Sequence, residues 1–194
     1  LPAPFDNEEI YKSLCIKTLH GQDKDALAKT QKGNWRYDIV EAGYKCNMTD
    51  IMAVIGSIEL TRYDSEIMPK RKAICDLYYE AFSKYSWAEL PEFKNENKNS
   101  CYHLFPLRIR GVSETQRDAI IKEIFEKEVS VNVHFIPVPM MSFYKNLGYD
   151  VKNYPVTFDN YSREISLPVF FDLTFALVST VIDAFVDSVE KIFK

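Results

Sequence analysis

Beyond residue 100 the spacing of the apolar residues changes repeatedly between a period of two and a period of about 3.6. The shorter period occurs in three stretches, 101–110, 129–135 and 164–170, which indicates three β-strands. Helical periods lie between these strands and after the last one. Strands and helices in this order predict an α/β fold in which helices pack on one face of a small sheet.

Each strand is expected to present one apolar face. In CYHLFPLRIR (101–110) that face is predicted to carry Cys101, His103, Phe105, Leu107 and Ile109. In VSVNVHF (129–135) the apolar face holds Val129, Val131, Val133 and Phe135, and the polar face holds Ser130, Asn132 and His134.

Three helical segments stand out. Ser113 and Gln116 form a capping-box pattern that predicts the start of a helix, and residues 174–193 form the last helix of the chain. A longer pattern covers residues 49–85, where Pro69 interrupts the period. It predicts one long kinked helix or two helices placed end to end, with Asn47 or Thr49 as the N-cap.

The N-terminal part has less pattern. Residues 7–19 read as a short helix with an acidic first turn, and residues 20–47 read as a long loop. We therefore divide the chain into residues 1–47 and residues 48–194, the latter holding the long helix and the α/β layer.

Composition excludes several classes of partner. A formal net charge of −4 argues against a nucleic-acid ligand, and no apolar stretch approaches the roughly 20 residues that a membrane span needs. The four cysteines are scattered without a CxxC pair, so we expect reduced thiols, no metal site and a cytoplasmic protein.

The histidines differ in their expected surroundings. His134 shares the polar face of its strand with Asn132, so a functional role and a solvated position are about equally supported. His103 shares a face with apolar residues, which favours a buried, hydrogen-bonded histidine.

The stretch GYKCNMTD (43–50) lies just before the long helix. Lys45 and Asn47 could bind an anion together with the free amides of the first helical turn. The alternative is that Asn47 or Thr49 caps the helix and Lys45 is solvated. No nucleophile elbow, phosphate loop or HExxH motif is present, and a small hydrolase using His134 has no nucleophile motif to support it.

Several longer segments occur in a family-specific order: WRYDIVEAGYKCNMTDIMAVIGSIEL, CYHLFPLRI, VSVNVHFIPVPMMSFYKNLGY and SREISLPVF. In this respect the chain resembles the C-terminal part of the DegT/DnrJ/EryC1/StrS aminotransferases, which aminate keto groups on nucleotide-linked sugars with pyridoxal 5'-phosphate. The resemblance implies the small C-terminal α/β domain of the type I, aspartate-aminotransferase-like fold, with a long kinked linking helix. Residues 1–47 would then be the tail end of the large cofactor domain and the interface loop.

The resemblance also implies roles for individual residues. Family members are homodimers whose interface loop reaches the neighbouring active site, so Lys45 and Asn47 would contact the cofactor phosphate in trans. His134, Asn132 and Tyr44 would bind the nucleotide-sugar substrate. Relatives often carry a histidine where this chain has Pro139.

In the family, the lysine that forms the Schiff base lies upstream of the point at which this chain starts, so the resemblance places that lysine outside this chain. With the abrupt, methionine-free start, this predicts the C-terminal portion of an aminotransferase that uses glutamate as amino donor and is inactive alone. The competing interpretation is a non-catalytic binding or assembly module that keeps the small-domain fold. Apolar LTFALVST in the last helix indicates an additional packed surface.

Overall fold

The computed structural model describes residues 7–22, 38–46 and 48–193. The chain divides into two compact units, an N-terminal unit of residues 1–61 and a C-terminal unit of residues 62–194. These units do not test the predicted division into residues 1–47 and 48–194, which stays a prediction.

In the N-terminal unit, helix α1 (Glu8–Thr18) forms where the sequence predicts it. The side chain of Asn7 accepts the N–H groups of Glu9 and Ile10 at 3.0 and 3.2 Å, and the two glutamates of the first turn complement the helix dipole. The stretch that begins with Gly43 returns to the end of α1. Its backbone lies so close that a Cβ on Gly43 would approach the nitrogen of Gly21 to 2.3 Å.

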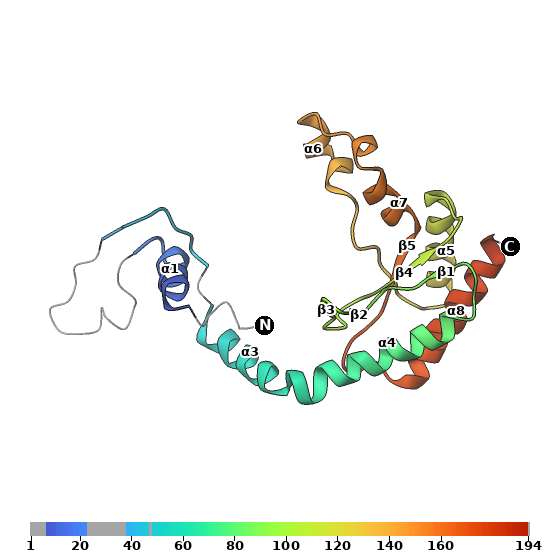
Figure 1. Ribbon diagram of the computed structural model, residues 1–194, viewed down its shortest axis with the longest axis horizontal. Helices are drawn as coiled ribbons and strands as arrows, with labels where there is room; N and C mark the ends of the chain where they lie inside the picture. Colours follow the sequence, from blue (N-terminus) through green and yellow to red (C-terminus); the bar gives the residue numbers. More distant parts are fainter. Residues whose placement is uncertain (1–6, 23–37, 47, 194) are drawn as a thin grey trace. The chain divides into compact units, whose positions relative to one another are not determined.

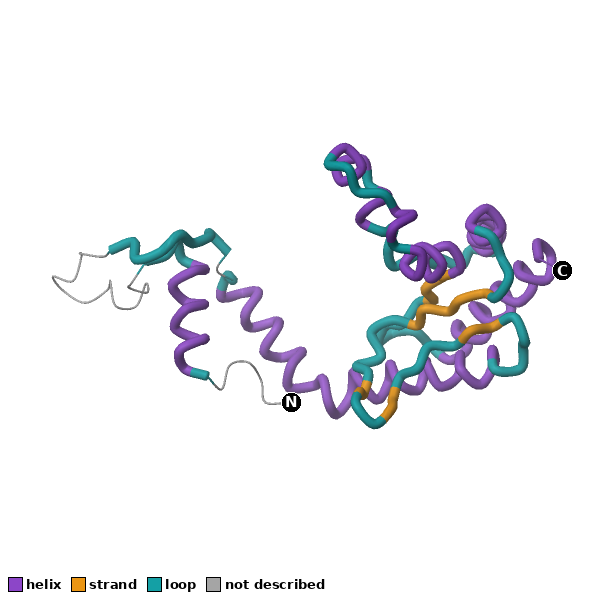
Figure 2. The backbone as a smooth tube through the Cα atoms, turned by 45° about the horizontal axis from the view of Figure 1, so that its top comes forward, coloured by secondary structure: helices purple, strands orange, loops and turns teal. Residues whose placement is uncertain are grey.

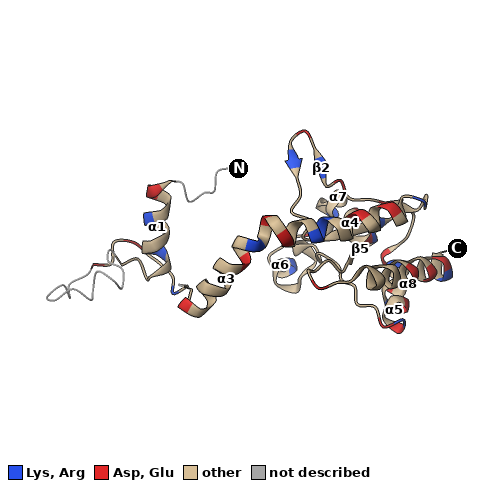
Figure 3. Ribbon diagram, turned by 90° about the horizontal axis from the view of Figure 1, so that it is seen from below, with Lys and Arg blue, Asp and Glu red and all other residues tan. Residues whose placement is uncertain are grey.

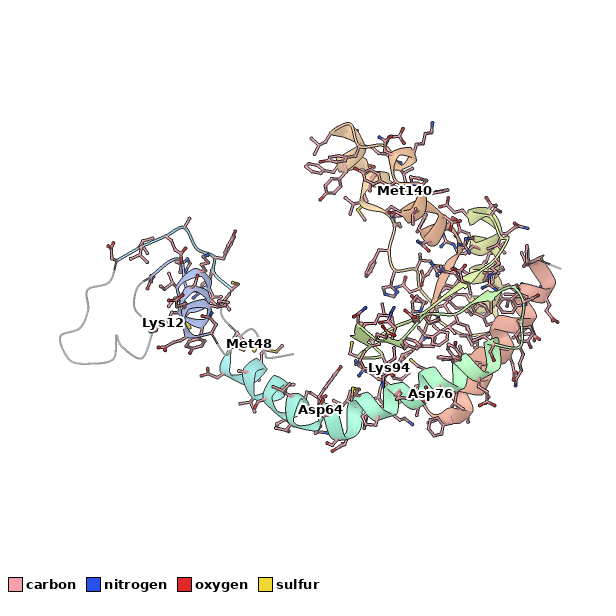
Figure 4. All side chains as sticks on the ribbon, viewed as in Figure 1. Lys12, Met48, Asp64, Asp76, Lys94 and Met140 are labelled. Atoms are coloured by element: carbon pink, nitrogen blue, oxygen red, sulfur yellow. The ribbon has the colours of Figure 1, made fainter. Side chains whose placement is uncertain are left out.

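Helical residues run without a break from α3 (Asp50–Arg62) through a π-helix, η2 (Tyr63–Ile67), into α4 (Met68–Phe82). Asp64 lies in the π-helix and Asp76 in α4 (Figure 4). The predicted interruption at Pro69 is confirmed as a change of helix type. Because Pro69 has no N–H and its ring crowds the carbonyl four residues earlier, the preceding turn widens, and the Met68 N–H bonds the Tyr63 carbonyl five residues back. At the start of α3, Thr49 Oγ1 accepts the Met52 N–H at 3.4 Å.

The C-terminal unit contains a three-stranded antiparallel sheet in the order β1-β4-β5 (Figure 2). The strands are β1 (Ala88–Glu89), β4 (Phe105–Ile109) and β5 (Glu164–Leu167). A separate hairpin pairs β2 (Lys94–Asn95) with β3 (Lys98–Asn99).

Three helices cover one face of this sheet: α4, α5 (Glu114–Glu126) and α8 (Phe175–Phe193). The capping box at Ser113 is present, and the predicted final helix begins one residue later than expected. Both α4 and α8 carry acidic and basic residues (Figure 3). The core is built from apolar side chains of these helices and of alternate strand residues, including Ile74, Phe82, Phe105, Leu107, Ile120, Ile165, Val178 and Phe185.

The sequence predicted helices on only one face of the sheet, but the opposite face also carries a helix. Helix α7 (Pro155–Arg163) lies on the side away from α4 and α8 (Figure 1). It is reached through three short segments, η3 (Val138–Met140), α6 (Ser142–Asn146) and η4 (Val151–Asn153). The polar residues of β4 explain this second layer, because Arg108 binds Asn160 of α7.

The first predicted strand is shorter than expected, and the expectation for His103 is wrong. Tyr102 adopts a left-handed φ of 54° and is buried, whereas Cys101 and His103 are exposed and precede β4. One residue in this conformation breaks the period-two alternation, because it turns the chain and exchanges the faces of its neighbours.

The second predicted strand, 129–135, forms no named strand. Its only ladder contact in the described part of the chain is an isolated bridge between Asn132 and Ser166. Val129 and Val131 are buried as expected, but Phe135 is 71% exposed. The ladder stops because the next residue of β5 along the ladder, Glu164, uses its main-chain groups elsewhere: its N–H donates to Tyr161 and its carbonyl accepts from Arg117.

The third predicted strand ends early, at Leu167, because Pro168 has no N–H to continue a ladder. The carbonyl of Pro168 accepts a hydrogen bond from the hydroxyl of Tyr78 at 3.1 Å. The cysteines are free thiols, and burial raises the pKa of Cys75 in α4 to about 12. No helix in the described ranges is long and apolar enough to cross a membrane.

Candidate functional site

A cavity of about 500 Å³ opens on the face of the sheet that carries α7. Strands β1 and β4, the segment after the Asn132–Ser166 bridge, α7 and the start of β5 all contribute to its walls or their support. The lining residues are Pro91, Pro106, Arg108, His134, Phe135, Thr157, Asn160, Tyr161 and Glu164.

The alternation of β4 and β5 selects the residues at this cavity. Leu107 pairs with Ile165 on the core face, so their neighbours Arg108 and Glu164 pair on the opposite face. Pro106 is tolerated in the middle of a sheet because its partner Ser166 directs its own N–H and carbonyl to Asn132. The polar side chains of a short strand are thereby placed at the cavity.

The positive charge at the cavity is balanced by acids. The guanidinium of Arg108 pairs with Glu89, with Nη2 and Oε1 2.5 Å apart, and also bonds the side chain of Asn160. Arg163 donates to Glu89 at 2.9 Å and to Asp159 at 2.5 Å. The Arg163 hydrogen bond, with Arg108 close by, lowers the pKa of Glu89. This network holds α7 to the sheet and leaves Arg108 as a hydrogen-bonded cation in the wall.

Glu164 has a different environment. It is 6% exposed, and its carboxylate accepts the main-chain N–H of His134 at 3.0 Å and the hydroxyl of Ser166. Desolvation by burial raises the pKa of Glu164, although these two hydrogen bonds and the charge of Arg117 oppose the increase. A buried carboxyl with a raised pKa beside a cavity is a common property of functional sites.

The imidazole of His134 is half-buried, with its ring 4.6 Å from that of Phe135. Its Nδ1 atom is buried and has no hydrogen-bond partner among the residues that the structure describes. An unsatisfied buried N–H is rarer in proteins than an unsatisfied acceptor, which favours the proton on Nε2. Nε2 is therefore the nitrogen through which His134 can donate to a ligand oxygen.

A second cavity, of about 410 Å³, adjoins the first. Both are lined by Thr157, and the second is otherwise walled by Val138, Pro139, Tyr144, Tyr149 and Tyr154. Met140 marks the segment that leads into this region (Figure 4). The walls of the second cavity are aromatic and apolar, whereas those of the first include charged side chains. The two cavities can therefore contact chemically different parts of one ligand.

The residues that the sequence singles out fall in different places. His134 lines the first cavity, whereas Asn132 is exposed, does not line it, and accepts the N–H of Val133 with its side chain. Tyr44 and Lys45 are exposed in the N-terminal unit, where the Tyr44 carbonyl accepts the His20 N–H at 3.0 Å and Lys45 forms a bridge with Leu19. Asn47 lies outside the described residues.

The sequence analysis did not identify Arg108, Asn160, Tyr161 and Glu164 as residues of this cavity. The alternation of 105–109 could have identified Arg108 as a polar-face residue. The other three depend on how α7 and β5 meet the sheet, for which the sequence carries no local signal.

Comparison with known proteins supplies the family context. The model of the DegT/DnrJ/EryC1/StrS aminotransferase family matches residues 4–186. The structure is similar to that of Spr1654 from Streptococcus pneumoniae, described as a sugar aminotransferase, in its PMP-form. The TM-score is 0.87 at 43% identity, over 97% of this chain and 47% of that one.

Two curated relatives match at comparable coverage. The spore coat polysaccharide biosynthesis protein SpsC of Bacillus subtilis is 30% identical over 95% of this chain and 48% of its own length. A UDP-4-amino-4,6-dideoxy-N-acetyl-beta-L-altrosamine transaminase of Campylobacter jejuni is 27% identical over 97% of this chain and 48% of its own. The chain thus spans about half the length of these relatives.

Proposed function

The chain belongs to the DegT/DnrJ/EryC1/StrS aminotransferase family, and from that premise we propose that it is the C-terminal part of an aminotransferase acting on a keto sugar nucleotide. In this proposal residues 48–194 form the linking helix and small domain of the type I fold, residues 1–47 are the tail end of the large domain and the interface loop, and glutamate is the amino donor. The coverage of about half of each relative is consistent with such a division. The observation that supports the substrate assignment is the cavity whose lining includes His134, Arg108 and Tyr161.

The two adjoining cavities support a nucleotide-linked sugar as the ligand. Such a molecule has polar hydroxyl and phosphate oxygens and a planar base. His134 Nε2 would donate to an oxygen in the charged cavity, whose wall also contains the Arg108 guanidinium. The base would stack in the aromatic cavity around Tyr149.

The residues present do not by themselves fit pyridoxal phosphate. Attachment of that cofactor needs a lysine amine within a cavity. None of the residues lining the two cavities is a lysine, nor is any around a third cavity of about 310 Å³ lined by Ala73, Asp76, Leu77, Glu80 and Phe175. The proposal therefore places the Schiff-base lysine outside this chain, and no chemical step is assigned to the residues described.

In the complete enzyme the interface loop, GYKCNMTD (43–50), would contact a second subunit. Tyr44 and Lys45 are exposed and their side chains are available to a second subunit, with Asn47 beside them in the sequence. In a homodimer, Lys45 and Asn47 would bind the cofactor phosphate of the partner subunit and Tyr44 its substrate.

The competing function is a non-catalytic binding or assembly module. The absence of a lysine from the linings of the three cavities favours this alternative as much as it favours a divided active site. The two differ in nucleotide binding, because an assembly module has no need to recognise a sugar nucleotide.

Isothermal titration calorimetry of the 194-residue chain with UDP tests the assignment. The His134→Asn variant removes the Nε2 position, whereas His134→Gln keeps an amide N–H near it. We expect the asparagine variant to lose about tenfold in affinity and the glutamine variant to remain within about threefold of the unmodified chain. Absence of UDP binding, or equal affinity in all three proteins, would reject the assignment of His134.

A further inference from the structure

The segment that carries His134 is attached to β5 in an unusual way. Asn132 and Ser166 exchange two main-chain hydrogen bonds, of 3.2 and 2.7 Å. In an antiparallel ladder the next exchange of this kind would join residues 134 and 164, two positions further along each strand. That main-chain exchange is not made.

The main chain of Glu164 has other partners. Its N–H donates to the carbonyl of Tyr161 at the end of α7, and its carbonyl accepts from Arg117 Nη1 at 3.0 Å. Arg117 is 1% exposed and also donates to the Tyr161 carbonyl, at 2.7 Å. The helix end and the buried arginine thus occupy the main-chain groups of residue 164 that would otherwise pair with residue 134.

The side chain of Glu164 takes the place of its main chain. Oε2 accepts the His134 N–H at 3.0 Å, while Oε1 accepts the hydroxyl of Ser166. Ser166 is 3% exposed, so its end of this connection is sheltered from water. The carboxylate thereby joins the strand residue that pairs with Asn132 to the residue that lines the cavity.

We propose that Glu164 is a positioning residue, whose carboxylate holds the His134 main chain against β5 and so places the imidazole at the cavity. This role rests on the proposed function of His134 as a ligand-binding residue. It requires an accepted hydrogen bond at this position and the reach of a glutamate side chain. It does not require a negative charge.

Three substitutions separate these requirements. Glu164→Ala removes the acceptor, Glu164→Asp keeps the charge but shortens the side chain by one methylene, and Glu164→Gln keeps both the reach and an acceptor oxygen. Glu126→Gln, at an exposed position near the end of α5, is the control. Far-UV circular dichroism establishes which variants retain the fold.

Two measurements are made on the full chain: the hydrogen-exchange rate of the His134 amide by NMR, and the affinity for UDP. We expect the alanine and aspartate variants to exchange this amide about tenfold faster and to bind UDP about tenfold more weakly. The glutamine variant and the control should stay within about threefold on both measurements. If alanine fails to fold, the comparison of aspartate with glutamine carries the test.

An unchanged exchange rate in the alanine or aspartate variant would overturn the proposal, as would a glutamine variant as impaired as these two. The exchange measurement needs no ligand. If the unmodified chain fails to bind UDP, the proposed function fails, while the exchange rates still decide whether Glu164 holds the His134 main chain.

Discussion

Arg117, on the helix that follows β4, donates a hydrogen from Nη1 to the main-chain carbonyl of Glu164 at 3.0 Å. The two residues are distant in the sequence, and the contact is buried. It joins the core side of the molecule to the strand that begins at the candidate site.

Replacing Arg117 by alanine is expected to lower the free energy of unfolding by about 3 kcal/mol, because it leaves the buried carbonyl of Glu164 without its donor and removes one of the two donors of the Tyr161 carbonyl. Urea denaturation followed by circular dichroism measures the loss. Lys122→Ala, at an exposed position of the same helix, is the control and should change stability by less than about 0.5 kcal/mol. Similar losses in both variants would mean that the Arg117 contacts contribute nothing specific.

The stability of the Glu164→Gln variant should depend on pH in a defined direction. Burial raises the Glu164 pKa above its ordinary value of 4.5, so the folded state binds more protons than the unfolded state and this residue makes stability fall as pH rises through that range. Glutamine does not titrate. The variant should therefore gain stability relative to the unmodified chain between pH 4 and pH 7, as measured by urea denaturation at both values. A relative loss over this range would show that the hydrogen bonds, and not desolvation, control the carboxyl.

Alanine substitutions at two glycines with positive φ allow the cost of backbone strain to be compared with the cost of steric contact. Gly111 has φ 82° and a Cβ there would lie 3.2 Å from the ring of Phe193, whereas Gly148 has φ 90° and no atom within 4 Å. Gly148→Ala should cost about 1 kcal/mol from the left-handed conformation alone. Gly111→Ala should cost about 2 kcal/mol, since the ring must also move. Thermal unfolding compares them, and equal losses would mean that Phe193 yields without resistance.

Pyridoxal phosphate provides a test of where the covalent chemistry lies. After incubation with the cofactor and borohydride reduction, intact-mass analysis should find no stoichiometric adduct on this chain, because no lysine lines the three cavities. Scattered substoichiometric labelling of exposed lysines is the expected background. One specific, complete adduct would place the Schiff-base lysine within these residues and contradict the proposed division.

The helices other than α7 were the most predictable part of this protein. The box of Ser113 and Gln116 forms as the sequence indicates, and the interruption at Pro69 appears as a π-helix at the expected place. These features depend on side chains and amides within one or two turns of each other, so a local pattern contains the information needed to predict them.

Strand ends and faces were less predictable. The alternating pattern correctly gave Phe105, Leu107 and Ile109 a buried face, but it extended that face to His103, which is exposed. A period of two identifies strand-like residues without showing where a left-handed residue such as Tyr102 ends the alternation.

The candidate site, too, was predicted only in part. The sequence by itself determined the polar character of His134 and, through its ordered motifs, the family. Only the tertiary structure decided that Glu164, and not a longer strand, holds His134 in place. The reason is that each main-chain group must find a partner, and the partners of Glu164 come from Arg117 and Tyr161, which a distant helix and the end of α7 bring to it.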